Sequence, residues 1–261
     1  MRIPILAAAL VVAMPGTGVP AQAPDATFEV TSVKRVVSPD IGYGIRPIDA
    51  SGRFYAVITV YDLFRIAYGS PLALVESQVV DAPQWVKTDR FEITAKAAGT
   101  LSQDRLMAMM RALLADRFQL RVRKETRQLP VFDLVLDRGQ PGPRLRPADG
   151  QCTSVFADAK PDFSRTCGFK RVTATAISAL GMTLDDFAGG IQNRPDVQRV
   201  VRNRTGLSGT FDIDVEFMPE PDAPAAAFFT AFREQLGLRF QSATGPLDAH
   251  VIERVEPPSP D

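Results

Sequence analysis

Three carboxylates alternate with apolar residues over residues 210–217, at Asp212, Asp214 and Glu216. Side chains at every second position of a strand point to one face, so these three carboxylates share a face. They could hold a calcium ion or a cationic ligand. The alternative is a solvated sheet face whose charge is balanced by basic residues on neighbouring strands, with Arg239 as one candidate partner. Since calcium takes about six or more oxygen ligands, we favour the solvated face.

A single histidine, His250, precedes the apolar pair Val251 and Ile252 on a predicted strand. Hydrolytic triads need a positioned general base, and no partner for this imidazole is legible in the sequence. A single histidine supplies too few ligands for a histidine-based metal site. We find no nucleophile elbow, phosphate loop or dinucleotide fingerprint. The sequence therefore predicts no catalytic residue, no metal and no cofactor.

Trp85 is the lone tryptophan, and it follows Ala82-Pro83 ahead of a predicted strand. Its ring could be an exposed platform for a ligand. It could equally anchor the core at the edge of a sheet, which is the commoner place for a single tryptophan. Both interpretations stay open at this point.

The two cysteines, Cys152 and Cys167, lie in the most polar stretch of the chain. Two thiols without nearby histidines are too few ligands for a zinc site. An even cysteine count in an exported protein favours a disulfide. We therefore predict a Cys152–Cys167 bridge. By closing a loop, this disulfide would stabilise the folded state by on the order of 3 kcal/mol in the chain-entropy model.

The first residues have the pattern of a cleaved export signal. Arg2 supplies a positive charge, residues 3–14 (IPILAAALVVAM) are apolar, and small residues lead to Ala21-Gln22-Ala23. This pattern predicts a signal peptide over residues 1–23, cleaved after Ala21 or Ala23. The apolar run is shorter than the roughly 20 residues that span a bilayer. We expect an exported protein, periplasmic or extracellular, that is not integral to the membrane after cleavage.

The amino-acid composition limits which classes of binding partner are expected. Of the 261 residues, 30 are basic and 30 acidic, and 45% are hydrophobic, as in a folded globular protein. A balanced charge gives no electrostatic argument for binding nucleic acid. An unknown protein or small ligand outside the cytoplasm is the expected partner.

The elements that would position these residues occur twice. Thr59 and Thr183 each open a Thr-x-x-Asp helix start, which is followed by a short apolar strand, an alternating strand and a second helix. The second helices end in similar sequences around Phe118 and Phe240. Each then leads to a strand, a turn and a closing strand, over residues 131–137 and 250–255. The predicted fold is α+β, with two related β-α-β-β-α-β-β halves whose small sheets carry helices on one face.

These patterns divide the chain. Residues 24–137 form the first half and residues 171–261 the second. Between them, residues 138–170 begin with a Pro/Gly-rich run and continue into the cysteine-bearing stretch, so they are predicted to be a linker and loop.

Several short motifs together resemble one known family. They are residues 28–34 (FEVTSVK), 67–69 (AYG), 82–85 (APQW), 113–118 (LLADRF), 205–209 (TGLSG) and 234–238 (EQLGL). The chain resembles a secreted, soil-associated family, expanded in acidobacteria and defined by a domain of unknown function. The resemblance implies a signal peptide and one conserved module, and it offers no active site to transfer. Some relatives add a membrane-bound metallopeptidase, but this chain has no His-Glu-x-x-His, so that activity does not carry over.

The sequence favours a non-enzymatic binding or interaction module outside the cytoplasm, because such a role requires nothing that the sequence lacks. The alternatives are a secreted hydrolase that uses carboxylates, since any two acids can meet in space, and a sensory or envelope-assembly accessory domain.

Overall fold

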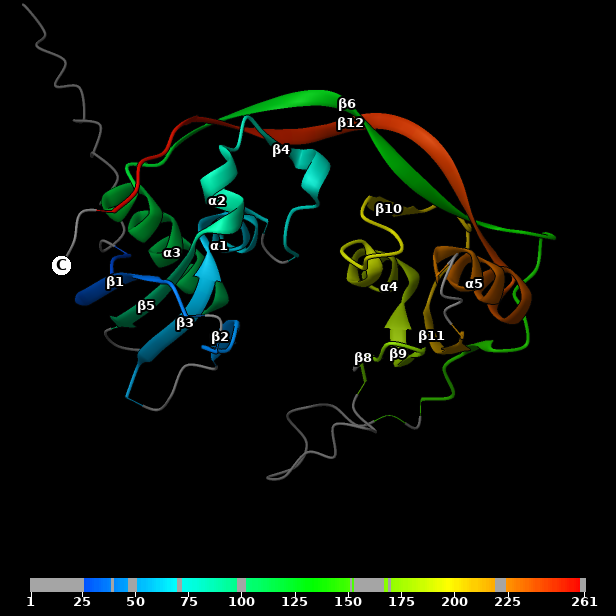
Figure 1. The fold of residues 1–261 in the computed structure, drawn as a ribbon. Coiled ribbons are helices and arrows are strands. Elements are labelled where there is room, and N and C mark those ends of the chain that lie inside the picture. Colours follow the sequence, from blue (N-terminus) through cyan, green and yellow to red (C-terminus); the bar gives the residue numbers. More distant parts are fainter. Residues whose placement is uncertain are drawn as a thin grey trace, which may run out of the picture.

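The computed structural model describes residues 26–38, 40–46, 51–69, 72–97, 102–150, 152, 167–168, 170–218 and 224–258. The predicted signal peptide lies outside the described residues. The described chain forms two lobes that are bridged by two long strands, β6 (Arg121–Leu136) and β12 (Leu238–Arg254) (Figure 1). Among the described residues, no helix has the length and apolarity that crossing a membrane requires.

The first lobe is an antiparallel sheet with helices on one face (Figure 1). Its strand order is β1-β5-β3-β2, and the strands are β1 (Val30–Val36), β5 (Arg90–Lys96), β3 (Arg53–Thr59) and β2 (Gly44–Arg46). The helices are α1 (Val60–Tyr68), α2 (Gln84–Thr88) and α3 (Gln103–Arg117), and the 3-10 turn η1 (Glu76–Gln78) precedes the short strand β4 (Val79–Val80). Side chains of α1, α3, β3 and β5 form its core.

The second lobe is also an antiparallel four-stranded sheet with helices. Its antiparallel sheet has the order β7-β11-β9-β8, formed by β7 (Leu145–Pro147), β11 (Thr210–Glu216), β9 (Ala176–Thr183) and β8 (Lys170–Val172). The helices are α4 (Leu184–Ile191), α5 (Pro224–Ala231) and the π-helical turn η3 (Phe232–Leu236), and β10 (Val200–Asn203) is the short strand. A second hydrophobic core lies here, rich in phenylalanine.

The two predicted helix starts are confirmed. The Thr59 hydroxyl accepts a hydrogen bond from the Asp62 amide at 3.1 Å, and the Thr183 hydroxyl accepts one from the Asp186 amide at 3.1 Å. In each case the threonine satisfies an amide that has no partner within the helix. The helix behind each cap then turns its apolar side chains inward.

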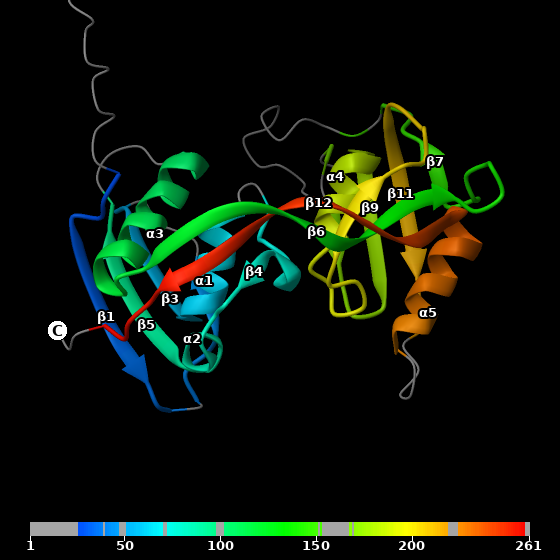
Figure 2. The ribbon, with the colours of Figure 1, turned by 90° about the horizontal axis from the view of Figure 1, so that it is seen from above.

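β6 and β12 pair antiparallel along their length, so they form a two-stranded ribbon across both lobes (Figure 2). β10 of the second lobe adds to β6, which comes from the first lobe, with Val200 opposite Val131. β4 of the first lobe adds to β12, which comes from the second lobe, with His250 opposite Val79. Each lobe is therefore completed by a strand that begins in the other.

For the end of each half, the sequence predicts a strand, a turn and a closing strand. This prediction is wrong, because β6 and β12 are each one continuous strand. Pro130 and the Gly245-Pro246 pair, residue types that are common in turns, lie inside these strands. In the ribbon, Pro130 lies opposite Thr244, and Gly245 lies opposite Leu129. Neither β4 nor β10 pairs with this central stretch. Proline, which has no N–H to donate, is tolerated on such an open side.

Part of the predicted linker belongs to the second lobe. β7 lies within residues 138–170 and pairs with β11. Just before β7, the Gly142 amide donates to the Leu236 carbonyl at 2.8 Å, and the Arg144 amide donates to the Gln235 carbonyl at 3.0 Å. These bonds satisfy carbonyls at the end of η3, so this loop is fixed to the helix end.

The strands of both sheets have the same order, whereas η1 and α2 of the first lobe have no counterpart among the described elements of the second. Phe91 lies opposite Ile58, the residue before the Thr59 cap, and Phe211 lies opposite Met182, the residue before the Thr183 cap. A duplication stays a prediction, which superposing residues 53–137 on 168–255 would test.

One expected equivalence between the halves is wrong. Phe118 is the C-cap directly after α3, whereas Phe240 lies inside β12. The residues with positive φ that end the two helices are Gln119 (φ 51°) and Gly237 (φ 66°), so the similar motifs are offset relative to the helix ends.

Candidate functional site

The three alternating carboxylates lie on β11, and arginine from a neighbouring segment approaches two of them. Arg144 lies 3.4 Å from Asp214 and 3.6 Å from Glu216, while Asp212 accepts a hydrogen bond from the Gly181 amide at 2.9 Å. The predicted partner, Arg239, pairs instead with Asp137 at 3.4 Å. Within the described ranges no three metal-binding side chains gather around a common point. The ion face stays a prediction, and Arg144 already supplies it with positive charge.

Trp85 lies on α2 and packs against the first core. Its indole is half-buried and meets the Phe91 ring edge-on, with the ring centres 6.3 Å apart. Of the two interpretations left open by the sequence, this geometry corresponds to the core anchor, because the ring face that could hold a ligand is partly covered.

His250 is a buried residue of β12 with 7% exposure. Its ring meets Phe64 and Tyr68 edge-on, at 6.1 Å and 5.8 Å between ring centres, and its Nδ1 has no hydrogen-bond partner in the described structure. Burial lowers the pKa of His250, and the charge of Lys124 on β6 lowers it further, whereas Asp248 opposes this shift. The imidazole is thus held neutral among aromatic rings.

The lowered pKa of His250 predicts a pH-dependent stability. The unfolded chain takes up a proton on this imidazole from about pH 6.5 downward, before the folded chain does. We expect the free energy of unfolding to fall between about pH 7 and pH 5.5, and His250→Asn to show a smaller fall over this window. Urea titrations at both pH values measure the effect, and equal falls in the two proteins would contradict it. If an activity is found, the same variant is expected to retain it.

The predicted disulfide is confirmed. The Cys152 and Cys167 sulfurs are 2.05 Å apart and the Cα atoms 4.9 Å apart, within the range for a native bridge.

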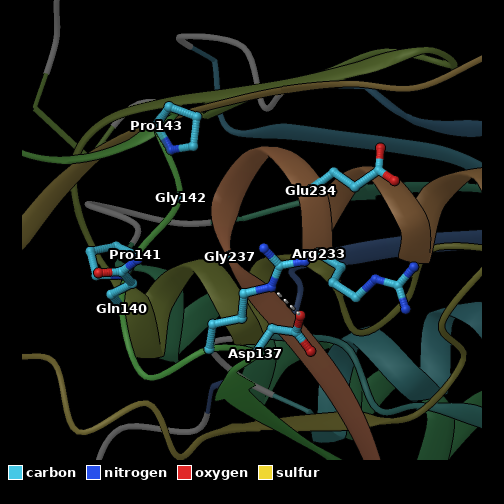
Figure 3. Close-up of a pocket in the computed structure, with 9 residues that line it drawn as sticks. Asp137, Gln140, Pro141, Gly142, Pro143, Arg233, Glu234 and Gly237 are labelled. Carbon is cyan, nitrogen blue, oxygen red and sulfur yellow. Dashed lines mark ion pairs between the residues drawn. The ribbon is translucent and has the colours of Figure 1, made fainter.

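A hollow of about 560 Å³ lies where the loop after β6 meets the end of η3. Figure 3 shows Gln140 and Pro141 on one side of this hollow and Arg233 and Glu234 on the other, with Asp137 and Gly237 between them. We call it the loop hollow. Arg138, Gly142 and Pro143 complete its lining.

A second hollow, of about 380 Å³, lies on the face of the ribbon beside α5. We call it the aromatic hollow. Three half-buried phenylalanines form its floor, with their ring centres between 5.0 and 5.8 Å apart. They are Phe132 of β6, Phe229 of α5 and Phe240 of β12. Thr230, Arg233, Arg239 and Ser242 surround them, so Arg233 lines both hollows.

The chain folds this way because α5 and η3 bury one face and expose the other. Phe228 and Phe232 are fully buried in the second core, while Thr230 and Arg233 are exposed. η3 ends at Gly237, whose positive φ of 66° turns the chain directly into β12. The helix end, the loop bound to it and the ribbon therefore meet around Arg233.

Charge around the two hollows is unbalanced, although the whole chain is neutral. Three arginines and two carboxylates line the hollows: Arg138, Arg233 and Arg239 against Asp137 and Glu234. Asp137 is engaged by Arg239 at 3.4 Å and by Arg138 at 4.0 Å. The Arg199 guanidinium lies 4.7 Å from the centre of the Phe132 ring, which is a cation–π distance. Arg233 makes no ion pair in the described part of the chain.

Sequence reasoning missed both hollows. The sequence indicates Arg239 only as a partner for the carboxylate face, and Phe240 only as a marker of the repeat. Phe132, Phe229 and Phe240 come from three separate elements, and only the register of β6 against β12 places them together. A signal was present in the adjacent residues Phe228 and Phe229. A helix with one apolar face buries only one of two neighbouring side chains in the core, so the other ring has to lie elsewhere.

Comparison with known proteins identifies a domain but no activity. A family model described as a protein of unknown function (DUF3738) matches residues 61–255. No curated protein and no solved structure matches the chain. The match confirms the expected domain-of-unknown-function family, and the chemistry has to be argued from the hollows themselves.

Proposed function

Because the chain belongs to the DUF3738 family, whose function is unknown, we propose a function from the geometry: the protein is an exported, non-enzymatic binding module. Its binding surface consists of the loop hollow and the aromatic hollow. The ligand carries negative charge together with an aromatic or other apolar group.

The observation that carries this proposal is Arg233, an exposed guanidinium without an ion-pair partner in the described structure that lines both hollows. An arginine beside an aromatic floor favours a ligand that presents a carboxylate, sulfonate or phosphate next to a ring, since the guanidinium binds the anion and the rings bury the apolar part. Exposed phenylalanine surface beside α5 gains from being covered.

The Cys152–Cys167 disulfide supports a site of action outside the cytoplasm, because such bridges persist in oxidising compartments and are rare in the cytosol. Export also rests on the predicted signal peptide. Sequencing the N-terminus of protein recovered from the producing cells checks this part, and the expected first residue lies between Gln22 and Asp25.

An anionic aromatic dye tests the binding surface directly. We expect the mature protein to bind 8-anilinonaphthalene-1-sulfonate, with a rise in dye fluorescence, because its sulfonate matches Arg233 and its rings match the aromatic floor. Arg233→Glu is expected to weaken this binding by about tenfold or more, since the charge that attracts the sulfonate becomes repulsive.

The matched control is Arg171→Glu, which reverses an exposed arginine of the same lobe on β8, away from both hollows. It should leave the dye affinity within about twofold of the unchanged protein. Near-UV circular dichroism must be the same in all three proteins, because this dye also binds loosely packed states. Equal loss of binding in both variants, or no binding by the folded protein, would refute the proposed surface.

A further inference from the structure

We infer that the occupant of the two hollows is an extended acidic peptide segment of about five residues that carries at least one aromatic side chain. This inference rests on the proposed binding function and names the class of partner.

The first argument is length. The chain passes both hollows as it leaves η3 and enters β12, because Gly237 lines the loop hollow, whereas Arg239, Phe240 and Ser242 of β12 line the aromatic hollow. A strand rises about 3.3 Å per residue, so the lining from Gly237 to Ser242 spans at most about 16 Å. A compact aromatic acid fills one hollow. A peptide that contacts both hollows must be in an extended conformation and about five residues long.

The second argument is exposure. Most side chains that surround the hollows are themselves exposed to solvent, among them Arg138, Gln140, Arg233, Arg239 and Ser242. A small molecule is usually enclosed over most of its surface in its site. These hollows cover a ligand from one side only, which suits a chain segment laid across a surface.

Charge and ring placement give the third argument. Arginines occur along the whole track, with Arg138 at the loop hollow, Arg233 between the hollows and Arg239 at the aromatic hollow. Carboxylates at intervals along an extended chain reach such a series, whereas one anionic group reaches only one of them. The phenylalanine floor lies at one end, so the segment places its aromatic side chain there.

Titration calorimetry with the mature protein tests the inference. The probe is the peptide acetyl-Glu-Phe-Glu-Phe-Glu-amide, and the short comparison is acetyl-Glu-Phe-amide. We expect the long peptide to bind at least about tenfold more tightly than the short one, because only the long one reaches both hollows. Replacing both of its phenylalanines by serine is expected to abolish measurable binding.

Two surface variants locate the peptide without touching either core. Arg138→Glu lies in the loop hollow and Ser242→Asp in the aromatic hollow, and both residues are exposed. Each should weaken the long peptide by about fivefold or more, while only Ser242→Asp should weaken the short one. Arg171→Glu should change neither affinity.

Several outcomes would overturn the inference. Equal affinities for the two peptides would mean that a single hollow binds the ligand. Dye binding that depends on Arg233, without any peptide binding, would leave the proposed surface standing but exclude an acidic peptide as its partner. Tighter binding of an acidic oligosaccharide, with tetragalacturonate as the probe, would assign the track to a carbohydrate. Absence of both dye and peptide binding would refute the proposed function itself.

Discussion

Truncating Leu236 to alanine is expected to lower the free energy of unfolding by about 2–5 kcal/mol, as is truncating Leu114. Both leucines have 0% exposure, Leu114 on α3 in the first core and Leu236 on η3 in the second. Each truncation removes buried methyl groups and leaves a cavity that the close-packed surroundings fill only in part. Because each lobe is completed by a strand from the other, we further expect both variants to lower the midpoint of one shared unfolding transition.

Urea unfolding followed by near-UV and far-UV circular dichroism measures both effects. Met218→Ala is the matched control, because Met218 is 80% exposed and its truncation should change the free energy by less than about 0.5 kcal/mol. A loss at Leu114 or Leu236 no larger than that of the control would contradict the assigned burial. Two separate transitions would contradict the coupling of the lobes.

Gly237→Ala is the second large expected effect. Gly237 has a φ of 66°, and a Cβ built there would lie 2.6 Å from the backbone nitrogen of Gly142 and 2.8 Å from the carbonyl oxygen of Gln140. Backbone atoms cannot rotate away as a flexible side chain does, so the loop has to move. Moving it strains the hydrogen bond from the Gly142 amide to the Leu236 carbonyl. We expect a loss of roughly 3 kcal/mol, which combines backbone strain with weakened hydrogen bonds.

Gly206→Ala separates the two contributions. Gly206 has a similar φ of 74°, but no atom lies within 4 Å of a Cβ built on it. This variant should therefore show the cost of the left-handed backbone alone, about 1–2 kcal/mol. Thermal and urea unfolding of both variants give the comparison. If Gly237→Ala costs no more than Gly206→Ala, the loop yields freely and is not fixed to the helix end.

The local elements were predictable because their signals are short-range. Each of them follows from residues a few positions apart in the sequence. They are the Thr59 and Thr183 caps, the helix α3 that begins after Ser102, and the alternating strands β5 and β11. The disulfide followed from cysteine count and expected compartment. In each of these cases the residues that decide the structure are neighbours in sequence or have no competing partner.

The ribbon and the hollows depend on contacts between distant segments. The first half of β6 carries many charged residues, which in isolation are typical of a solvated turn or edge. In the structure these charges find partners across the ribbon, with Lys124 at 2.7 Å from Asp248 and Arg123 at 3.1 Å from Glu253. Only the pairing of β6 with β12 reveals this. Because the aromatic hollow is built on that register, a local pattern can indicate Phe229 but cannot bring it together with Phe132 and Phe240.

The crossing of the two long strands has a mechanical consequence. A force that pulls the lobes apart loads two covalent backbones in parallel, since β6 and β12 each run from one lobe into the other. Hydrogen bonds between the strands lie across this load rather than along it. The spacing of the lobes is thus as inextensible as the strands themselves, and the lobes separate only when one of them unravels.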